Sequence, residues 1–349
     1  MPIISVSAGL AIGLAFGVIG LLSGFCLMSS LREWWTANDG RKVRSYAVAL
    51  AIAILGTQFI AGAGLVDIAK SLYLQPSFSA PLIFAGGLLF GFGMVLSNGC
   101  ASRALVLLGK GNLRSLIVIA IIGIAAQMTL KGLIAPARLA FLQATQTTPS
   151  AVSAPALLAN MGIDEFAARI VVTLIASGAL LIFAFSDRQF RRSYGQIAAG
   201  LAIGSLVVVG WLATGWLGAD DFDPIPVTSL TFISPIADTL QYTMLSTGLS
   251  LNFGVALVVG VLSGSLFTAV LTGRFNLESY TSANHMLRSI SGAALMGIGG
   301  AMAYGCSIGQ GLTGLSTLGM PSFIAVAGIL LGAALAIRGA VVIPALATR

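Results

Sequence analysis

The sequence predicts an all-α polytopic membrane protein, and three observations support this class. Of its 349 residues, 57% are hydrophobic and only 8% are charged, whereas soluble domains carry roughly 25% charged residues. The mean hydropathy is +0.98. Apolar runs long enough to cross a bilayer as a helix, about 20 residues each, recur from one end of the chain to the other. These observations exclude a soluble globular protein.

Apolar runs bounded by charged residues or proline predict about nine transmembrane helices. The first run has neither the basic segment nor the cleavage site of a signal peptide, so we interpret it as a span. No polar stretch is long enough to fold alone, and we therefore expect 1–349 to form a single integral membrane domain. The predicted spans are 5–29, 45–66, 81–98, 115–135, 166–186, 196–217, 246–272, 289–304 and 321–343.

Basic residues gather in alternate connections between these spans. They occupy 30–44, 101–114, 187–195 and 273–288, whereas the connection 218–241 is acidic. By the positive-inside rule, this pattern predicts a periplasmic N-terminus and a cytoplasmic C-terminus. The formal net charge of +7 is then explained by topology, and nucleic acid is not expected as a partner.

Glycine is unusually frequent and follows a repeated pattern. The 43 glycines make up about 12% of the chain, against an average near 7%, and small residues let membrane helices pack closely. Segments 91–100 and 297–306 share their glycine and cysteine spacing, and 20–24 matches 260–264 upstream. We interpret these matches as an internally duplicated Gly-rich core with repeat-like halves 5–135 and 246–343. The sequence leaves open whether the repeat is inverted or parallel.

Each aligned Gly-Cys pair predicts a broken or re-entrant helix. The pair closes a Gly-rich stretch and opens a short second segment, 101–108 in one copy and 307–318 in the other. The first amides of such a half-helix lack partners within the helix and attract an anion. We expect Ser97 or Asn98 to cap the first half-helix and Ser307 to cap the second.

The chain has three cysteines, and each follows a glycine within two residues. Cys26, Cys100 and Cys306 lie far apart and form no CxxC pair, so a disulfide framework is not expected. A neutral thiol is a weak hydrogen-bond donor, and such a lining lets a soft oxysulfur dianion bind and leave, whereas a fixed cation would hold it. The cysteines therefore predict three thiols in series along a transport path.

Two other functions use the same cysteines. Three thiolates are suitable ligands for Cu(I), and a membrane thiol oxidoreductase would also need cysteines. The single histidine, His285, excludes a His-rich metal site, and no base lies near a cysteine in the sequence to activate a nucleophile. We therefore expect no enzyme activity, catalytic residue, bound metal or cofactor, and we keep the soft-metal transporter and the oxidoreductase as alternatives.

Three segments resemble the YeeE/YedE family of bacterial thiosulfate transporters. They are Ser23-Gly24-Phe25-Cys26, Leu96-Ser97-Asn98-Gly99-Cys100-Ala101-Ser102-Arg103 and Tyr304-Gly305-Cys306-Ser307-Ile308-Gly309-Gln310-Gly311. The resemblance implies thiosulfate uptake across the inner membrane through an hourglass-shaped protein, whose external dent leads to a central row of cysteines. It also implies a separate TusA-like sulfur carrier protein on the cytoplasmic side. Some relatives are linked to selenium, so a selenium compound is a further alternative substrate.

The resemblance and the predicted breaks together define the candidate substrate-binding residues. The family cysteines carry over to the three cysteines of this chain, and the other candidates are their neighbours in the same segments. The full set is Cys26, Cys100, Cys306, Gly24, Ser97, Asn98, Gly99, Gly305, Ser307 and Gln310.

Overall fold

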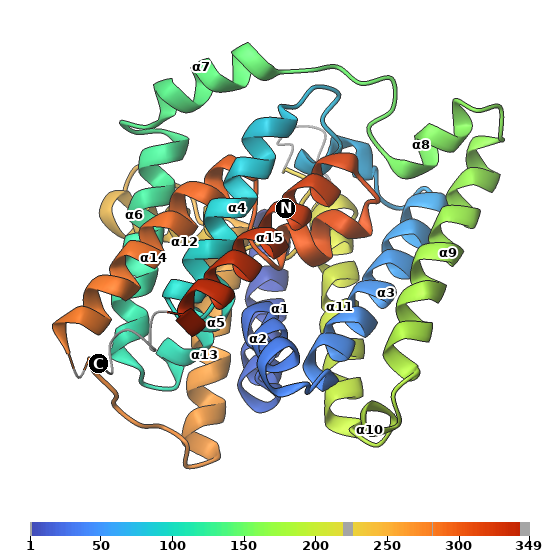
Figure 1. Ribbon diagram of the computed structural model, residues 1–349. Coiled ribbons are helices and arrows are strands. Elements are labelled where there is room, and N and C mark those ends of the chain that lie inside the picture. Colours follow the sequence, from blue (N-terminus) through green and yellow to red (C-terminus); the bar gives the residue numbers. More distant parts are fainter. Residues whose placement is uncertain (1, 219–225, 281, 343–349) are drawn as a thin grey trace.

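The computed structural model describes residues 2–218, 226–280 and 282–342 (Figure 1), and their regular structure is helical apart from isolated β-bridges. The predicted class, an all-α polytopic membrane protein, is confirmed. Three aspartates of the acidic connection, Asp220, Asp221 and Asp223, lie outside the described residues.

The helices follow one another with short connections. In chain order they are α1 (Pro2–Ser23), α2 (Leu27–Ala37), α3 (Arg41–Gly62), η1 (Ile68–Lys70), η2 (Leu72–Leu74), α4 (Ala80–Leu96), α5 (Ala101–Gly109), α6 (Leu113–Leu130), α7 (Ala135–Thr145), α8 (Ala154–Ala159), α9 (Glu165–Phe185), α10 (Arg188–Arg191), α11 (Tyr194–Gly215), α12 (Ile233–Leu245), α13 (Phe253–Leu271), α14 (Ala283–Met302), η3 (Gly309–Gly314) and α15 (Met320–Val342).

In the described part of the chain, eight helical segments are long and apolar enough to cross a membrane. Two of them combine a long helix with a short one, α1 with α2 and α4 with α5, and the others are α3, α6, α9, α11, α13 and α15. The remaining predicted span, 289–304, corresponds to α14, which packs against α4 and α6. Although α14 has 20 residues, it is less apolar because His285 and Arg288 lie in its first two turns.

Glycines bring the backbones of neighbouring helices into contact. Residues 86 and 93 of α4 face 299–303 and 292 of α14, so these two helices run antiparallel. Residues 9, 13 and 17 of α1 face 253–256, 257–260 and 261–265 of α13, so this pair runs parallel. Segments 91–100 and 297–306, which share the Gly-Cys spacing, therefore belong to antiparallel helices. Segments 20–24 and 260–264 belong to parallel helices.

The predicted first span, 5–29, is wrong at its C-terminal end. The helix breaks after Ser23, and α2 then continues to Ala37 through residues predicted as a connection. Gly24 ends α1 because its backbone is left-handed, with φ +67°, a conformation that glycine adopts without strain. The charged residues of α2 do not end the helix, since Leu27, Met28 and Leu31 bury its other face.

The second predicted half-helix, 307–318, is also different in the structure. Gly309–Gly314 form a π-helix rather than an α-helix, and only residues 315–316 continue it as an α-helix. The first half-helix is confirmed as α5.

Candidate functional site

Three breaks interrupt the helices, and each has a left-handed residue two positions before a cysteine. Gly24, Asn98 and Tyr304 have φ values of +67°, +58° and +57°. At the second and third breaks, the amide of the following glycine donates to the carbonyl five residues back, over 2.9 Å in both cases. This pattern is typical of a Schellman helix end. A turn with a left-handed residue therefore places each cysteine at the start of a new segment.

Two of the three cysteines lie side by side. The Sγ atoms of Cys26 and Cys100 are 3.5 Å apart, and both side chains are buried. Cys26 is the N-cap residue of α2 and Cys100 is the N-cap residue of α5, so two half-helices begin at this thiol pair. The Cys100 thiol is also 3.2 Å from the Ser102 hydroxyl. All three cysteines are free thiols.

The third cysteine is connected to this pair through a tyrosine. Cys306 is buried, and its Sγ atom accepts a hydrogen bond from the Gly309 amide over 3.2 Å. The next carbonyl, that of Ser307, accepts a bond of 2.5 Å from the Tyr46 hydroxyl. The Tyr46 ring stacks on Phe25, with 5.4 Å between ring centroids. Tyr46 therefore connects the third break to the first.

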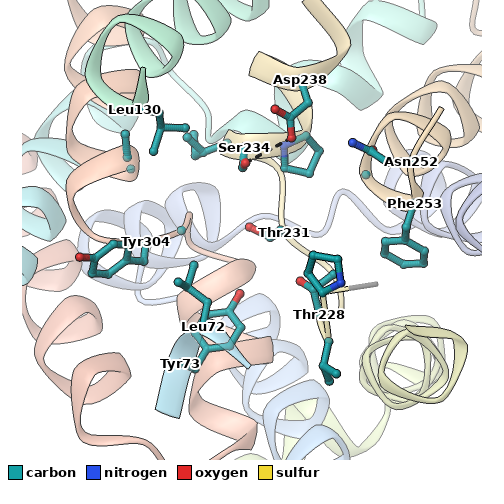
Figure 2. A pocket seen from close by; sticks show the side chains of 18 of the residues that line it. Leu72, Tyr73, Leu130, Thr228, Thr231, Ser234, Asp238, Asn252, Phe253 and Tyr304 are labelled. Carbon is teal, nitrogen blue, oxygen red and sulfur yellow. Dashed lines mark hydrogen bonds between the residues drawn. The ribbon is translucent and has the colours of Figure 1, made fainter. Parts of the chain in front are cut away.

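A cavity of about 480 Å³ reaches the third break (Figure 2). The cavity lies between the C-terminal ends of α6 and α14, the N-terminal ends of α12 and α13, and the segments around 70–75 and 226–235. Figure 2 shows Tyr73, Thr231 and Tyr304 on its walls, with Asp238 hydrogen-bonded to Ser234. Gly305, next to Cys306, also lines this large cavity.

Two smaller pockets lie at the opposite ends of the same helices. Their volumes are about 90 Å³ and about 290 Å³, and both are lined by Asn98 and His285. Gly99, next to Cys100, lines the smaller of them. The N-terminal ends of α6 and α14 contribute to these small pockets, whereas their C-terminal ends line the large cavity. The bundle is thus hollowed from both ends, next to Cys306 at one end and next to Cys100 at the other.

The predicted helix caps are wrong. Cys100 occupies the N-cap position of α5 and makes no side-chain capping bond there. At the π-helix, the Cys306 thiol rather than the Ser307 hydroxyl accepts a hydrogen bond from the first amide, that of Gly309. The Ser97 hydroxyl donates instead to the Ser289 carbonyl over 3.1 Å. The Asn98 side-chain oxygen accepts from Arg32 over 2.6 Å. Both side chains are therefore used to fix the turn against α14 and α2, and both line a small pocket.

Ser307 and Gln310 lie buried beside Cys306. The Gln310 side-chain nitrogen donates to the Ala303 carbonyl over 2.6 Å. Within the described ranges, the Ser307 hydroxyl and the Gln310 side-chain oxygen have no hydrogen-bond partner. The third break thus holds an unused hydroxyl donor next to a thiol, which is suitable for an anion.

The described residues include no group of three or more His, Cys, Asp or Glu side chains that could hold a metal ion. The arrangement therefore gives no support to the soft-metal alternative.

Comparison with known proteins identifies the family. A family model described as sulphur transport matches residues 22–335, which include all three breaks. The chain belongs to the sulphur transport family. The thiosulfate transporter TsuA of Escherichia coli (strain K12) is 24% identical to this transporter over 340 residues, which cover 93% of this chain and 92% of the relative. The thiosulfate transporter TsuA of Spirochaeta thermophila is 23% identical over 336 residues, covering 93% and 96%. The family resemblance seen in the sequence is confirmed.

Several residues at the site of this sulphur transport protein were not predicted from its sequence. Tyr46 had a usable signal, because it is a hydroxyl-bearing residue inside an apolar span. Tyr73, Thr231 and Asp238 had none, since they lie in polar connections that hydropathy alone assigns to the surface. The break at Gly24 was also missed, because Gly24 and Cys26 are separated by one residue whereas the glycine and cysteine of the other two breaks are adjacent.

Proposed function

We propose that this protein imports thiosulfate, or a closely related sulfur oxyanion, across the bacterial inner membrane through its three cysteine thiols. The observation that carries this proposal is the placement of two hollows at opposite ends of the bundle. One is lined by Gly305, which precedes Cys306 in the chain, and the other by Gly99, which precedes Cys100, with Cys26 in contact with Cys100. The names of the two relatives support thiosulfate as the substrate.

The basic residues at one end of the bundle indicate which end of the proposed transport path faces the cytoplasm. Arg32, Arg114 and Arg288 line the small pockets, and basic residues mark the cytoplasmic side of membrane proteins. We therefore assign the small pockets to the cytoplasm and the large cavity to the periplasm, with the N-terminus periplasmic and the C-terminus cytoplasmic. The antiparallel packing of α4 and α14 agrees with this assignment, because α14 must carry the chain back outward before α15 begins.

The chemistry of the path suits a dianion that has to leave again. Thiosulfate accepts hydrogen bonds, and the donors along the path are the neutral thiols and the Ser307 hydroxyl. The Cys306 sulfur already accepts a bond from a backbone amide, so its hydrogen is directed to another acceptor. Weak donors in series bind the substrate without trapping it. Gly99 has no side chain, and a Cβ atom there would lie 3.5 Å from the Arg103 side chain, an ordinary van der Waals distance, so room is left at this break.

On this proposal the protein is a transporter without catalytic residues, and a separate TusA-like carrier would receive sulfur on the cytoplasmic side. The proposed substrate contacts are those predicted from the sequence: Cys26, Cys100, Cys306, Gly24, Ser97, Asn98, Gly99, Gly305, Ser307 and Gln310.

Uptake of labelled thiosulfate by cells that express this chain tests the proposal. Sulfate, sulfite and selenite serve as competitors and define the substrate. We expect the double variant Cys100→Ala, Cys306→Ala to lose uptake while it still inserts, because both ends of the thiol series are removed. Serine at either position keeps a donor that is more strongly hydrated, so part of the activity should remain. Normal growth of the double variant on thiosulfate as sole sulfur source would refute the proposal.

A further inference from the structure

One carboxylate lies in the periplasmic cavity that an anion would enter. Asp238, on α12, is the acidic member of the described residues that line the large cavity. Its side chain accepts a hydrogen bond of 3.4 Å from Ser234. No ion pair within 4.0 Å involves Asp238 in the part of the chain that the structure describes. A like charge at this place opposes the binding of a dianion.

We propose that Asp238 determines how the cavity binds its substrate, by taking up one proton as the sulfur oxyanion enters. The inference rests on the proposed function, because it concerns the same substrate path. The proton comes from periplasmic water and binds a carboxylate oxygen of Asp238. No other bond forms or breaks, and the proton returns to water when the cavity empties. The neutral carboxyl group then donates a hydrogen bond where the carboxylate repelled the anion.

The surroundings of Asp238 favour this change of charge. Burial raises the pKa of Asp238 above its usual value, although Lys131 and the Ser234 hydroxyl act in the opposite direction. A higher pKa keeps the protonated form accessible at a less acidic pH. A dianion in the cavity acts in the same direction, because a nearby negative charge disfavours the ionised carboxylate.

The other charged and titratable groups around Asp238 are few. Lys131 follows α6, and its side chain donates to Gln241 on α12 over 3.4 Å. Lys70, Tyr73 and Tyr304 line the same cavity. The helix α13 carries no titratable residue, and the charged residues of α6 and α14 lie at their opposite ends. Asp220, Asp221 and Asp223 lie outside the described residues.

Initial rates of labelled thiosulfate uptake into right-side-out vesicles test the inference. For the wild-type protein we expect the apparent KM to fall as the external pH is lowered from about pH 8 to about pH 5, by at most tenfold per pH unit, the limit for one linked proton. Asp238→Asn keeps the shape and removes the charge, so its KM should stay low across this range. Asp238→Glu keeps a titratable group and should keep the pH dependence.

Asp164→Asn is the matched control. Asp164 caps α9, away from the cavity, and asparagine caps a helix about as well as aspartate. This variant should follow the wild-type pH profile. An Asp238→Asn variant that transports with the same pH dependence as the wild type would overturn the inference.

A second measurement does not depend on whether the variants fold. Thiosulfate added to the purified wild-type protein in weak buffer near pH 6 should raise the pH, by up to one proton bound per molecule. Thiosulfate binding without proton uptake would overturn the role of Asp238. Absence of any thiosulfate uptake by the wild type would instead refute the proposed function itself, so the two failures are distinguishable.

Discussion

The hydrogen bond between Tyr46 and the Ser307 carbonyl can be removed with little other change. Tyr46→Phe deletes the donor of this 2.5 Å bond. The ring that stacks on Phe25 remains, so packing is nearly preserved. Tyr46 is 8% exposed, and water therefore replaces the lost donor poorly. The substitution removes the hydrogen bond by which Tyr46 of α3 contacts the break bearing Cys306.

The size of the effect follows from burial. Removing one partner of a buried hydrogen bond costs about 1–3 kcal/mol. Since about 1.36 kcal/mol corresponds to a factor of ten, the position of Ser307 and Cys306 should be disfavoured by about five- to 150-fold. We expect a lower midpoint of thermal unfolding for the purified protein, and a loss of thiosulfate uptake up to this factor.

The assay compares Tyr46→Phe with Tyr280→Phe. The Tyr280 hydroxyl makes a longer bond of 3.4 Å to the Arg114 carbonyl, and this bond is only part-buried, so its loss should change little. Thermal unfolding in detergent and uptake in cells are measured for both variants at equal amounts of inserted protein. If Tyr46→Phe has the unfolding midpoint and uptake of the wild type, the bond does not position the break and the reasoning fails.

Two further predictions concern packing and topology. A Cβ atom at Gly91 would lie 2.1 Å from the Ile329 carbonyl oxygen on α15, whereas one at Gly178 meets nothing within 4 Å. Gly91→Ala should therefore destabilise the protein strongly and lower its amount in the membrane on an immunoblot, and Gly178→Ala should be neutral; equal amounts of both would contradict the α4–α15 contact. An alkaline phosphatase fused at Gly162 should be active and one fused at Arg191 should be silent, because only the first would be periplasmic. The reverse pattern would invert the assigned orientation.

The sequence predicted the long apolar helices, because hydropathy identifies them directly. Apolar runs gave the positions of the long helices, and the Gly-Cys spacing gave the breaks before Cys100 and Cys306. The break before Cys26 was not predicted, because it lies inside an uninterrupted apolar run that contains neither a charged residue nor a proline. The charged residues of α2 were misread as a connection, since hydropathy cannot distinguish an amphipathic helix from a loop when only part of its surface is buried.

The hydrogen-bond partners of the side chains at the site could not be predicted from the sequence. Ser97 and Asn98 have the residue types of helix caps, but contacts with Ser289 and Arg32, distant in the chain, occupy them instead. The large cavity is likewise assembled from segments as far apart as Lys70 and Tyr304. Its residues became recognisable only when the fold placed them around one cavity that reaches Gly305.

The hollows at both ends of the bundle concentrate the electric field of the membrane. On the proposed path, water and ions that enter them would bring the potential of each side to Gly305 and to Gly99, so most of the voltage would fall across the region between these two residues. An inside-negative potential opposes each negative charge by about 2.3 kcal/mol per 100 mV, and a dianion meets twice this work. On the proposed path, that work is done between Cys306, Cys26 and Cys100, so voltage should act on the passage between thiols rather than on binding in the cavity.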